Sequence, residues 1–304
     1  MAWEKEFDAW IADFLPDLEV REEEPMSRHT SFRTGGGAKR MAFPKNPEQL
    51  VLVMDAAYKC GGRPFILGNG TNLLAPDEGL DRLVVSLTGL RAMELEGEDV
   101  IAAEAGVPLV RLADFACQQS LTGLEFAHGI PGSLGGAVYM NGGAYGGEMS
   151  QVLESVTALF PEEGIRTLGL EEMELGYRHS FFMDHPEVVI LRARVRLKKG
   201  DQEAIRTTMR ELMARRKASQ PLEYPSAGST FKRPVGNFAG TLIDQCGLKG
   251  LTVGGAQVSE KHAGFIINIG GATSSDVEAL MAKVQEAVWA KTGVRLEPEV
   301  RVIR

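Results

Sequence analysis

Residues 127–149 read A-H-G-I-P-G-S-L-G-G-A-V-Y-M-N-G-G-A-Y-G-G-E-M. The stretch holds seven glycines after Ile130 and almost no charge, so it is too irregular for a helix and too rich in glycine for an ordinary strand. Glycine lacks a Cβ, which lets the backbone approach a neighbour closely. Backbone N–H groups in such turns can form a nest for an anion, typically phosphate. The stretch predicts either a loop around a phosphate-bearing cofactor or a bundle of packed turns, and its residues alone do not choose between them.

The composition indicates a globular protein of two or three domains. The chain has 304 residues, of which 44% are hydrophobic and 24% are charged, and it lacks an apolar run long enough to span a membrane. Its first ten residues are acidic and do not resemble a signal peptide, so we expect a cytoplasmic protein. The net charge of −8 argues against general nucleic-acid binding.

Cysteine and histidine spacing argues against a metal site. The three cysteines lie far apart with no C-x-x-C pair, which favours buried thiols in a reducing compartment. The five histidines show no H-E-x-x-H or similar ligand spacing, so we expect no metal.

Hydrophobic periodicity predicts a mixture of helices and strands. A strand over 188–197 alternates from Leu191 and places Arg192, Arg194 and Arg196 on one half-exposed face. Residues 27–38, with three glycines and two arginines, are expected to form a loop that reaches a ligand. The other predicted helices are 3–15, 47–60, 108–119, 201–217, 238–247 and 274–292, and the other strands 64–68, 80–87, 100–106, 152–160, 255–259, 264–269 and one near 294–303.

A second glycine turn, G-N-G-T-N-L-L over 68–74, directly follows the predicted strand 64–68. A strand that runs into a Gly-x-Gly turn commonly presents N–H groups to phosphate. The dinucleotide fingerprint needs a third glycine and then a helix, and neither is present. No G-x-x-x-x-G-K-[ST] motif occurs either, so the turn is neither a Rossmann site nor a P-loop.

Six separated motifs follow one another along the chain. They are G-N-G-T-N-L-L, G-I-P-G-S-L-G-G-A-V-Y-M-N-G-G-A-Y-G, Y-R-H-S-F-F, Y-P-S-A-G-S-T-F-K-R-P, G-G-A-Q-V-S and L-E-P-E-V-R. Together they resemble one enzyme family, the UDP-N-acetylenolpyruvoylglucosamine reductases, also called UDP-N-acetylmuramate dehydrogenases. Any one motif is weak, but their order over about residues 30–301 is highly specific, and the spacing resembles the short form. The first two motifs also resemble the wider vanillyl-alcohol-oxidase type of flavin domain.

The resemblance implies an α+β protein with a two-lobed vanillyl-alcohol-oxidase/PCMH-type FAD-binding domain and a small α+β substrate-binding domain. We place the two flavin lobes at 1–90 and 91–200 and the substrate domain at 201–304. The resemblance implies non-covalent FAD, NADPH as reductant, a UDP-sugar substrate and a ping-pong cycle in peptidoglycan precursor synthesis. We expect a monomer that binds neither nucleic acid nor membrane.

Three residues match the catalytic positions of the family. Reducing an enol ether needs a hydride at one carbon and a proton at the other, so the protein must supply an acid. Ser229 in A-G-S-T-F matches the proton donor, although a serine there is otherwise an ordinary turn residue. Glu299 matches the assisting glutamate, and only the motif register favours it over Glu297. Arg178 matches the arginine that orients and polarises the substrate.

A cationic cluster flanks Ser229 in this acidic chain. It suits a diphosphate, or equally the dipole at a helix C-terminus beside a solvated loop. The cluster comprises Arg215, Arg216, Lys217, Lys232 and Arg233. The expected substrate contacts are Tyr177, Lys217, Arg233, Gln257 and Asn268, with Arg233 where the long form has asparagine. The expected FAD contacts are Gly68, Asn69, Gly70, Thr71, Asn72, Leu73, Ile130, Pro131, Gly132, Ser133, Gly135, Gly136, Ala137, Asn141, Gly143 and Ala144.

Two rival functions remain open on the residues. An FAD-dependent oxidase of the same flavin fold would have a larger cap domain and no need for the A-G-S-T-F and L-E-P-E-V pair. A non-catalytic flavin- or nucleotide-binding module would have no use for Arg178, Ser229 and Glu299 together. Reduction of the flavin by NADPH separates the reductase from both.

Overall fold

The computed structural model describes residues 3–303 and divides the chain into two compact units. The first unit comprises Met1–Arg21, Arg40–Asn69 and Arg82–Arg215, and the second comprises Glu22–Lys39, Gly70–Asp81 and Arg216–Arg304. Each of these units is made of three separate segments of sequence, whereas each domain expected at 1–90, 91–200 and 201–304 is one continuous segment. Those expected domain boundaries stay predictions. No helix in residues 3–303 is both long and apolar enough to cross a membrane.

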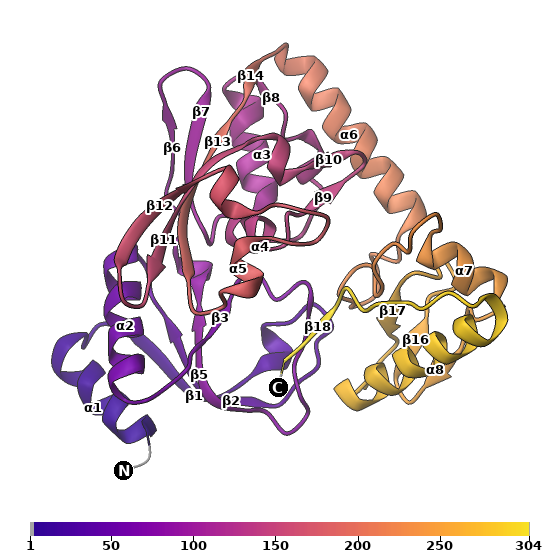
Figure 1. Cartoon of the computed structure of the whole chain (residues 1–304), viewed down its shortest axis with the longest axis horizontal. Helices are drawn as coiled ribbons and strands as arrows, with labels where there is room; N and C mark the ends of the chain where they lie inside the picture. Colours follow the sequence, from indigo (N-terminus) through magenta and orange to yellow (C-terminus); the bar gives the residue numbers. More distant parts are fainter. Residues whose placement is uncertain (1–2, 304) are drawn as a thin grey trace. The chain divides into compact units, whose positions relative to one another are not determined.

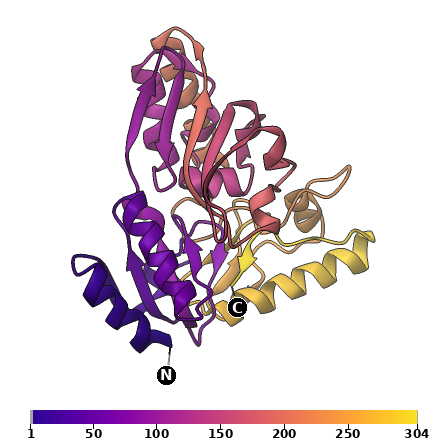
Figure 2. The same ribbon diagram turned by 60° about the vertical axis from the view of Figure 1, so that its left-hand side comes forward.

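The first unit begins with two packed helices, α1 (Trp3–Phe14) and α2 (Pro47–Lys59), as predicted (Figure 2). Phe7 and Ile11 of α1 are buried. The Asn46 side chain caps α2 by accepting the Gln49 N–H at 2.8 Å. A four-stranded sheet has the order β1 (Glu19–Pro25), β2 (Gly37–Phe43), β5 (Leu80–Ser86), β3 (Phe65–Leu67), and the chain passes between units within β1, β2 and β5.

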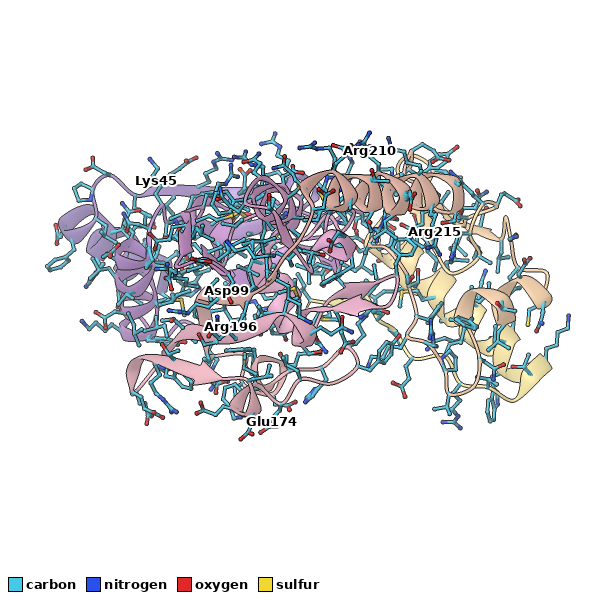
Figure 3. All side chains as sticks on the ribbon, turned by 90° about the horizontal axis from the view of Figure 1, so that it is seen from above. Lys45, Asp99, Glu174, Arg196, Arg210 and Arg215 are labelled. Atoms are coloured by element: carbon cyan, nitrogen blue, oxygen red, sulfur yellow. The ribbon has the colours of Figure 1, made fainter. Side chains whose placement is uncertain are left out.

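A five-stranded antiparallel sheet forms the rest of the first unit's framework (Figure 1). Its order is β12 (Gly164–Gly169), β11 (Leu153–Phe160), β13 (Val189–Arg196), β7 (Val100–Glu104), β6 (Met93–Glu96). The predicted arginine face of β13 is confirmed, and acidic residues of neighbouring segments neutralise it. Arg196 pairs with Asp99 at 2.9 Å (Figure 3), and Arg194 pairs with Glu96 at 2.6 Å. This face is a structural ion-pair network.

Helices α3 (Leu109–Gln118) and α6 (Gln202–Ser219) confirm two more predicted helices. Leu109, Leu112 and Ala113 are buried on the predicted apolar face of α3. Figure 3 labels Arg210 and Arg215 along the exposed α6. The short elements of this unit are β8 (Leu121–Thr122), β14 (Lys198–Lys199), α5 (Phe181–Asp184) and the 3-10 turns Leu87–Gly89, Glu125–Ala127, Met149–Gln151 and Glu171–Met173.

The glycine-dense stretch contains a helix, which corrects our prediction that it is too irregular for one. Helix α4 spans Leu134–Tyr139 and is capped by Ser133, whose hydroxyl accepts the Gly136 N–H at 3.4 Å. Leu134 and Val138 are fully buried, so one apolar face and one cap outweigh the low helix propensity of two glycines. A hairpin of β9 (Gly143–Ala144) and β10 (Gly147–Glu148) follows.

The second unit is an α+β domain in which α8 (Ser274–Thr292) lies beside a three-stranded sheet (Figure 1). The sheet has the order β15 (Thr252–Val253), β16 (Ala256–Val258), β17 (Ile266–Asn268), and α7 (Ala239–Gln245) packs on α8. Val277, Leu280 and Val284 of α8 are fully buried. Thr273 and Asp276 form a capping box, and Gly293 ends the helix with φ 68°. Met26–Arg28 is a 3-10 turn.

The strand predicted near 294–303 is shorter than expected. Only Arg301–Val302 forms a strand, β18, which pairs in parallel with β4 (Leu73–Leu74) of the G-N-G-T-N-L-L motif. Pro298 has no N–H for a ladder, and it makes only an isolated bridge with Phe231. The C-terminal segment is therefore shared between the Ser229 loop and the second glycine turn.

Candidate active site

Gly68 and Asn69, at the start of the second glycine turn, lie beside the I-P-G-S turn in the first unit. The Asn69 side chain donates a hydrogen bond to the Pro131 carbonyl at 3.2 Å across 62 positions of sequence. A Cβ on Gly68 would lie 2.7 Å from the Ser133 hydroxyl oxygen. Gly68 and Asn69 thus lie against the I-P-G-S turn, as expected if both turns contact the same cofactor.

Position 70, in the second unit, requires glycine because the main chain at His29 approaches it closely. Its φ is +62°, and a Cβ would lie 1.8 Å from the His29 carbonyl oxygen. The Ser31 N–H donates to the Gly70 carbonyl at 3.0 Å. Only glycine fits there. Part of the loop that we expected to reach a ligand therefore supports this turn.

The N–H groups at the start of α4 are used by the protein itself. Leu134 donates to the Val107 carbonyl and Gly135 to the Ala105 carbonyl, both at 2.8 Å, while Gly136 donates to Ser133. A Cβ on Gly135 would lie 2.9 Å from the Ala105 Cβ. Packed turns, the second of our two alternatives, explain this part of the stretch. These residues stay predicted flavin contacts, but the three N–H groups are engaged elsewhere.

The Asn72 side chain connects the second glycine turn to the segment that carries Glu299. Its Nδ2 donates to the Glu299 carbonyl at 3.0 Å, and the Arg301 N–H donates to the Asn72 carbonyl at 3.0 Å. Asn72 is a predicted flavin contact, yet its amide nitrogen bonds to the protein. The predicted flavin turn and the predicted catalytic glutamate are therefore one local structure within the second unit.

The loop that carries Ser229 is joined to the Glu299 segment through Thr230, the residue that follows Ser229 in the chain. Thr230 accepts the Glu299 N–H at 2.8 Å through its carbonyl, and its hydroxyl accepts the Ile266 N–H at 3.0 Å. Ser229 is exposed, Thr230 is buried and Glu299 is half-buried. The exposed Glu297 lies 3.6 Å from the Lys232 ammonium, so it is a partner of that lysine.

Arg178 occupies a strained turn in the first unit. Gly176 and His179 exchange main-chain hydrogen bonds at 3.1 and 3.2 Å, which leaves Tyr177 and Arg178 as the two turn residues. Arg178 has φ 54°, a left-handed conformation that a bulky side chain rarely adopts. Its Nη2 donates to the Gly143 carbonyl at 3.4 Å, so its guanidinium lies against the glycine-dense stretch. Such strain marks a candidate functional residue.

Known proteins identify the family. A family model described as the UDP-N-acetylenolpyruvoylglucosamine reductase C-terminal domain matches residues 220–303, and a model described as an FAD binding domain matches 38–169. The reductase of Latilactobacillus sakei is 48% identical over 286 residues, which cover 94% of each chain. That of Caldanaerobacter subterraneus is 47% identical over 293 residues, or 96% of each chain. The chain belongs to the UDP-N-acetylenolpyruvoylglucosamine reductase family.

A solved structure supports this family's fold. The crystal structure of the reductase from Thermus caldophilus is 35% identical, with a TM-score of 0.80, and covers 94% of this chain and 99% of that chain. The expected FAD-binding domain followed by an α+β domain is thereby confirmed, and FAD is the cofactor. The roles of individual site residues stay predictions.

The residues of this reductase fit a bound flavin. Asn69 and Pro131 are hydrogen-bonded to each other, and His128 lies just before the I-P-G-S turn. The His128 Nδ1 is buried and has no hydrogen-bond partner among residues 3–303, while its Nε2 lies 3.3 Å from Asp114. A buried polar atom without a partner beside the I-P-G-S turn is what a polar ligand would satisfy. The residues of the two turns stay the predicted FAD contacts of this chain.

The predicted substrate residues differ in their surroundings. Tyr177 is 53% exposed and lies beneath the Arg178 guanidinium, and Arg233 lies 4.3 Å above the exposed Phe238 ring. The Gln257 amide bonds to Thr252 at 3.1 Å. Asn268 is buried; it donates to Phe32 and accepts from Gly270 and Ala272. Lys217 is exposed, and its main-chain carbonyl accepts a hydrogen bond from the Lys261 ammonium.

One cluster of carboxylate and histidine side chains corresponds to no motif in the sequence. Ligand atoms of Glu174, His179 and Asp184 lie within 4.8 Å of one another around the Arg178 turn, and Glu174 is labelled in Figure 3. The spacing of four intervening residues on each side matches no motif, so periodicity and spacing could not identify it. Arg215 of the expected cationic cluster lies 4.9 Å above the Tyr145 ring, a contact that the sequence also did not signal.

Proposed function

We propose that this chain reduces the enolpyruvyl ether of UDP-N-acetylglucosamine enolpyruvate to UDP-N-acetylmuramate, with NADPH as reductant, in peptidoglycan precursor synthesis. The observation that supports it best is the main-chain bond between Thr230 and Glu299, which joins the backbone next to the predicted acid Ser229 to the segment of the predicted carboxylate, in a chain of this family. The proposal places the enzyme in the cytoplasm as a monomer that binds neither nucleic acid nor membrane, in keeping with its net charge of −8.

The reaction requires the chain to deliver one proton. Bound FAD supplies the hydride, so the chain supplies the acid and balances the charge that develops on the substrate. Ser229 is exposed on its loop and supplies the proton from its hydroxyl. A serine hydroxyl is a weak acid by itself, and the half-buried Glu299 assists it by stabilising the enolic intermediate.

Cationic residues bind the acidic ends of the substrate. Arg178 holds the enolpyruvyl carboxylate, because a planar guanidinium matches a carboxylate with two parallel hydrogen bonds. Lys217 and Arg233 bind the diphosphate, while Lys232 is drawn toward Glu297. Tyr177, Gln257 and Asn268 complete the substrate contacts.

Anaerobic half-reactions test this function. NADPH added without oxygen should bleach the visible absorbance of the flavin, and the enolpyruvyl UDP-sugar should then restore it and yield UDP-N-acetylmuramate. Neither an FAD-dependent oxidase nor a non-catalytic flavin module would be bleached by NADPH. A yellow protein that NADPH does not bleach, or that the UDP-sugar does not reoxidise, contradicts the proposal.

A further inference from the structure

The Asn141 side chain is buried and fully engaged within the first unit. Its Nδ2 donates to the Gly176 carbonyl at 3.0 Å and to the Glu148 carboxylate at 3.3 Å, and its Oδ1 accepts the Ser150 N–H at 2.9 Å. It is 1% exposed and has φ 41°. Asparagine tolerates this left-handed conformation better than most residues. An amide with all these bonds has a structural task and little left for a flavin.

Gly176 is the first residue of the turn that carries Arg178. The bond from Asn141 therefore attaches the glycine-dense stretch to the base of this turn. The next anchor follows the turn, where the buried Ser180 hydroxyl donates to the Tyr139 carbonyl at 2.7 Å. In the other direction, the Arg178 guanidinium donates to the Gly143 carbonyl. The turn and the glycine-dense stretch thus hold each other at three points.

A left-handed arginine costs conformational free energy, so the turn needs such anchors to keep its shape. Two of the three bonds do not involve the Arg178 guanidinium: Asn141 to Gly176, and Ser180 to Tyr139. Only the Asn141 bond reaches a residue of the turn itself. Losing it would leave the Gly176 carbonyl without that donor and would let Arg178 relax to an ordinary conformation. The guanidinium would then lose its fixed direction, although its charge would remain.

We infer that Asn141 is a positioning residue for Arg178 and that its side chain is not a flavin contact. The inference rests on the proposed function for the role of Arg178 in substrate reduction. It separates two tasks within one stretch: the I-P-G-S turn adjoins Gly68 and Asn69, and Asn141 orients the arginine.

Asn141→Gly tests the inference, because glycine keeps the positive φ and removes only the amide. We expect flavin content and the rate of flavin reduction by NADPH to stay near those of the parent protein. Reoxidation by the enolpyruvyl UDP-sugar should slow by about 100-fold, the scale of a small misplacement of a reacting group. The double variant Asn141→Gly/Arg178→Ala should be no slower than Arg178→Ala alone, because both substitutions act on the same interaction, that of the Arg178 guanidinium with the substrate.

A second readout does not depend on activity. Limited digestion with trypsin, followed by mass spectrometry, should show faster cleavage after Arg178 in Asn141→Gly, because the turn is released. Asn46→Ala is the matched control: it also removes an asparagine that bonds a main-chain group, at the start of α2. It should change neither half-reaction nor cleavage after Arg178. If Asn141→Gly does not fold, Asn141→Asp keeps the acceptor for Ser150 and removes the donor to Gly176.

The outcomes separate the inference from the proposed function. Loss of flavin or an equal slowing of both half-reactions in the Asn141 variants overturns the inference, as does an additive double variant. Arg178→Ala that reoxidises at the parent rate contradicts the proposed role of Arg178, and the trypsin result then decides the inference. Faster cleavage after Arg178 supports it, and unchanged cleavage overturns it.

Discussion

The main-chain carbonyl of Thr230 accepts the N–H of Glu299 at 2.8 Å. Thr230 also donates its N–H to the Gly264 carbonyl at 2.8 Å and is itself buried. Asn72 holds Glu299 from the other side through the Glu299 carbonyl. The positions of Ser229 and Glu299 are thus set by buried main-chain bonds, so substitutions of their side chains should change chemistry without changing the loop.

Ser229→Ala should leave flavin reduction by NADPH near normal and slow reoxidation by the enolpyruvyl UDP-sugar by about 1,000-fold or more, since it removes the acid. Glu299→Gln should slow the same half-reaction by about 100-fold. Because the two residues act as a unit, the double variant should be far less impaired than the product of the single effects. Stopped-flow absorbance of the flavin measures both half-reactions.

Glu297→Gln is the control for that pair. Glu297 belongs to the same segment but is exposed and lies near Lys232. Its substitution should leave both half-reactions within about two-fold, because exposed ion pairs contribute little. Equal losses in Glu297→Gln and Glu299→Gln would contradict the assignment of Glu299.

Gly70→Ala should destabilise the protein and remove bound flavin. The new Cβ would meet the His29 carbonyl at 1.8 Å in a left-handed conformation, for a cost on the order of 3 kcal/mol or more. Gly97→Ala has a similar φ of +67° with nothing within 4 Å, so it should cost only about 1 kcal/mol and keep its flavin. Urea unfolding and flavin absorbance compare the two. A Gly70 variant no worse than Gly97→Ala would show that the turn adjusts easily.

Arg233→Ala should raise the KM for the UDP-sugar by about ten-fold and leave flavin reduction unchanged, because it removes one charge-assisted contact. Phe238→Ala should have a smaller effect in the same direction, since the Phe238 ring supports the guanidinium at 4.3 Å. Arg295→Ala removes a similar stack, on Trp289 at 4.8 Å, outside the predicted site. Steady-state kinetics should show a normal KM for it, and a raised KM there would indicate a general effect of surface charge.

Local patterns predicted the long elements and missed the contacts that arrange the site. The apolar face of α3 and the arginine face of β13 follow from periodicity, and both are confirmed. Helix α4 was missed because its start depends on one cap, Ser133, and on burial among distant residues. The bonds of Asn72 to Glu299 and of Asn141 to Gly176 join positions 227 and 35 residues apart, which no local pattern can reveal.

The motif register alone identifies Arg178, Ser229 and Glu299 as candidate catalytic residues. It could not show that Arg178 is left-handed or that Thr230 joins the other two. Glycine content was ambiguous for a physical reason. Gly135 is needed for close packing and Gly70 for a sharp turn with positive φ, and the sequence shows glycine in both cases.

The Asp77 carboxylate should make stability depend on pH in acid. Desolvation alone would raise the pKa of Asp77, but hydrogen bonds from the Ser274 and Ser275 N–H groups and the Ser275 hydroxyl outweigh it and lower the pKa below the ordinary 3.8. These bonds, at 2.7 to 2.9 Å, hold the loop after the second glycine turn to the first turn of α8. The negative charge is also favoured by the helix dipole there.

The sign of the effect follows from the lowered pKa. The unfolded chain binds a proton more readily, so the stabilisation is complete above the unfolded pKa of about 4 and is lost as the pH falls through the lower folded pKa. Asp77→Asn should lower the free energy of unfolding by about 1 kcal/mol at most near pH 7, since the side chain is exposed and solvent screens it. The difference from the parent protein should shrink near pH 3.

Urea unfolding of the parent and of Asp77→Asn at about pH 7 and about pH 3 measures this difference directly. Asp81→Asn is the control, because the Asp81 side chain is 80% exposed and pairs at the surface with the Lys39 ammonium at 2.8 Å. Exposed pairs of this kind contribute about 0.5 kcal/mol or less. If the two variants lose equal stability at both pH values, the bonds between Asp77 and the start of α8 do not stabilise the second unit.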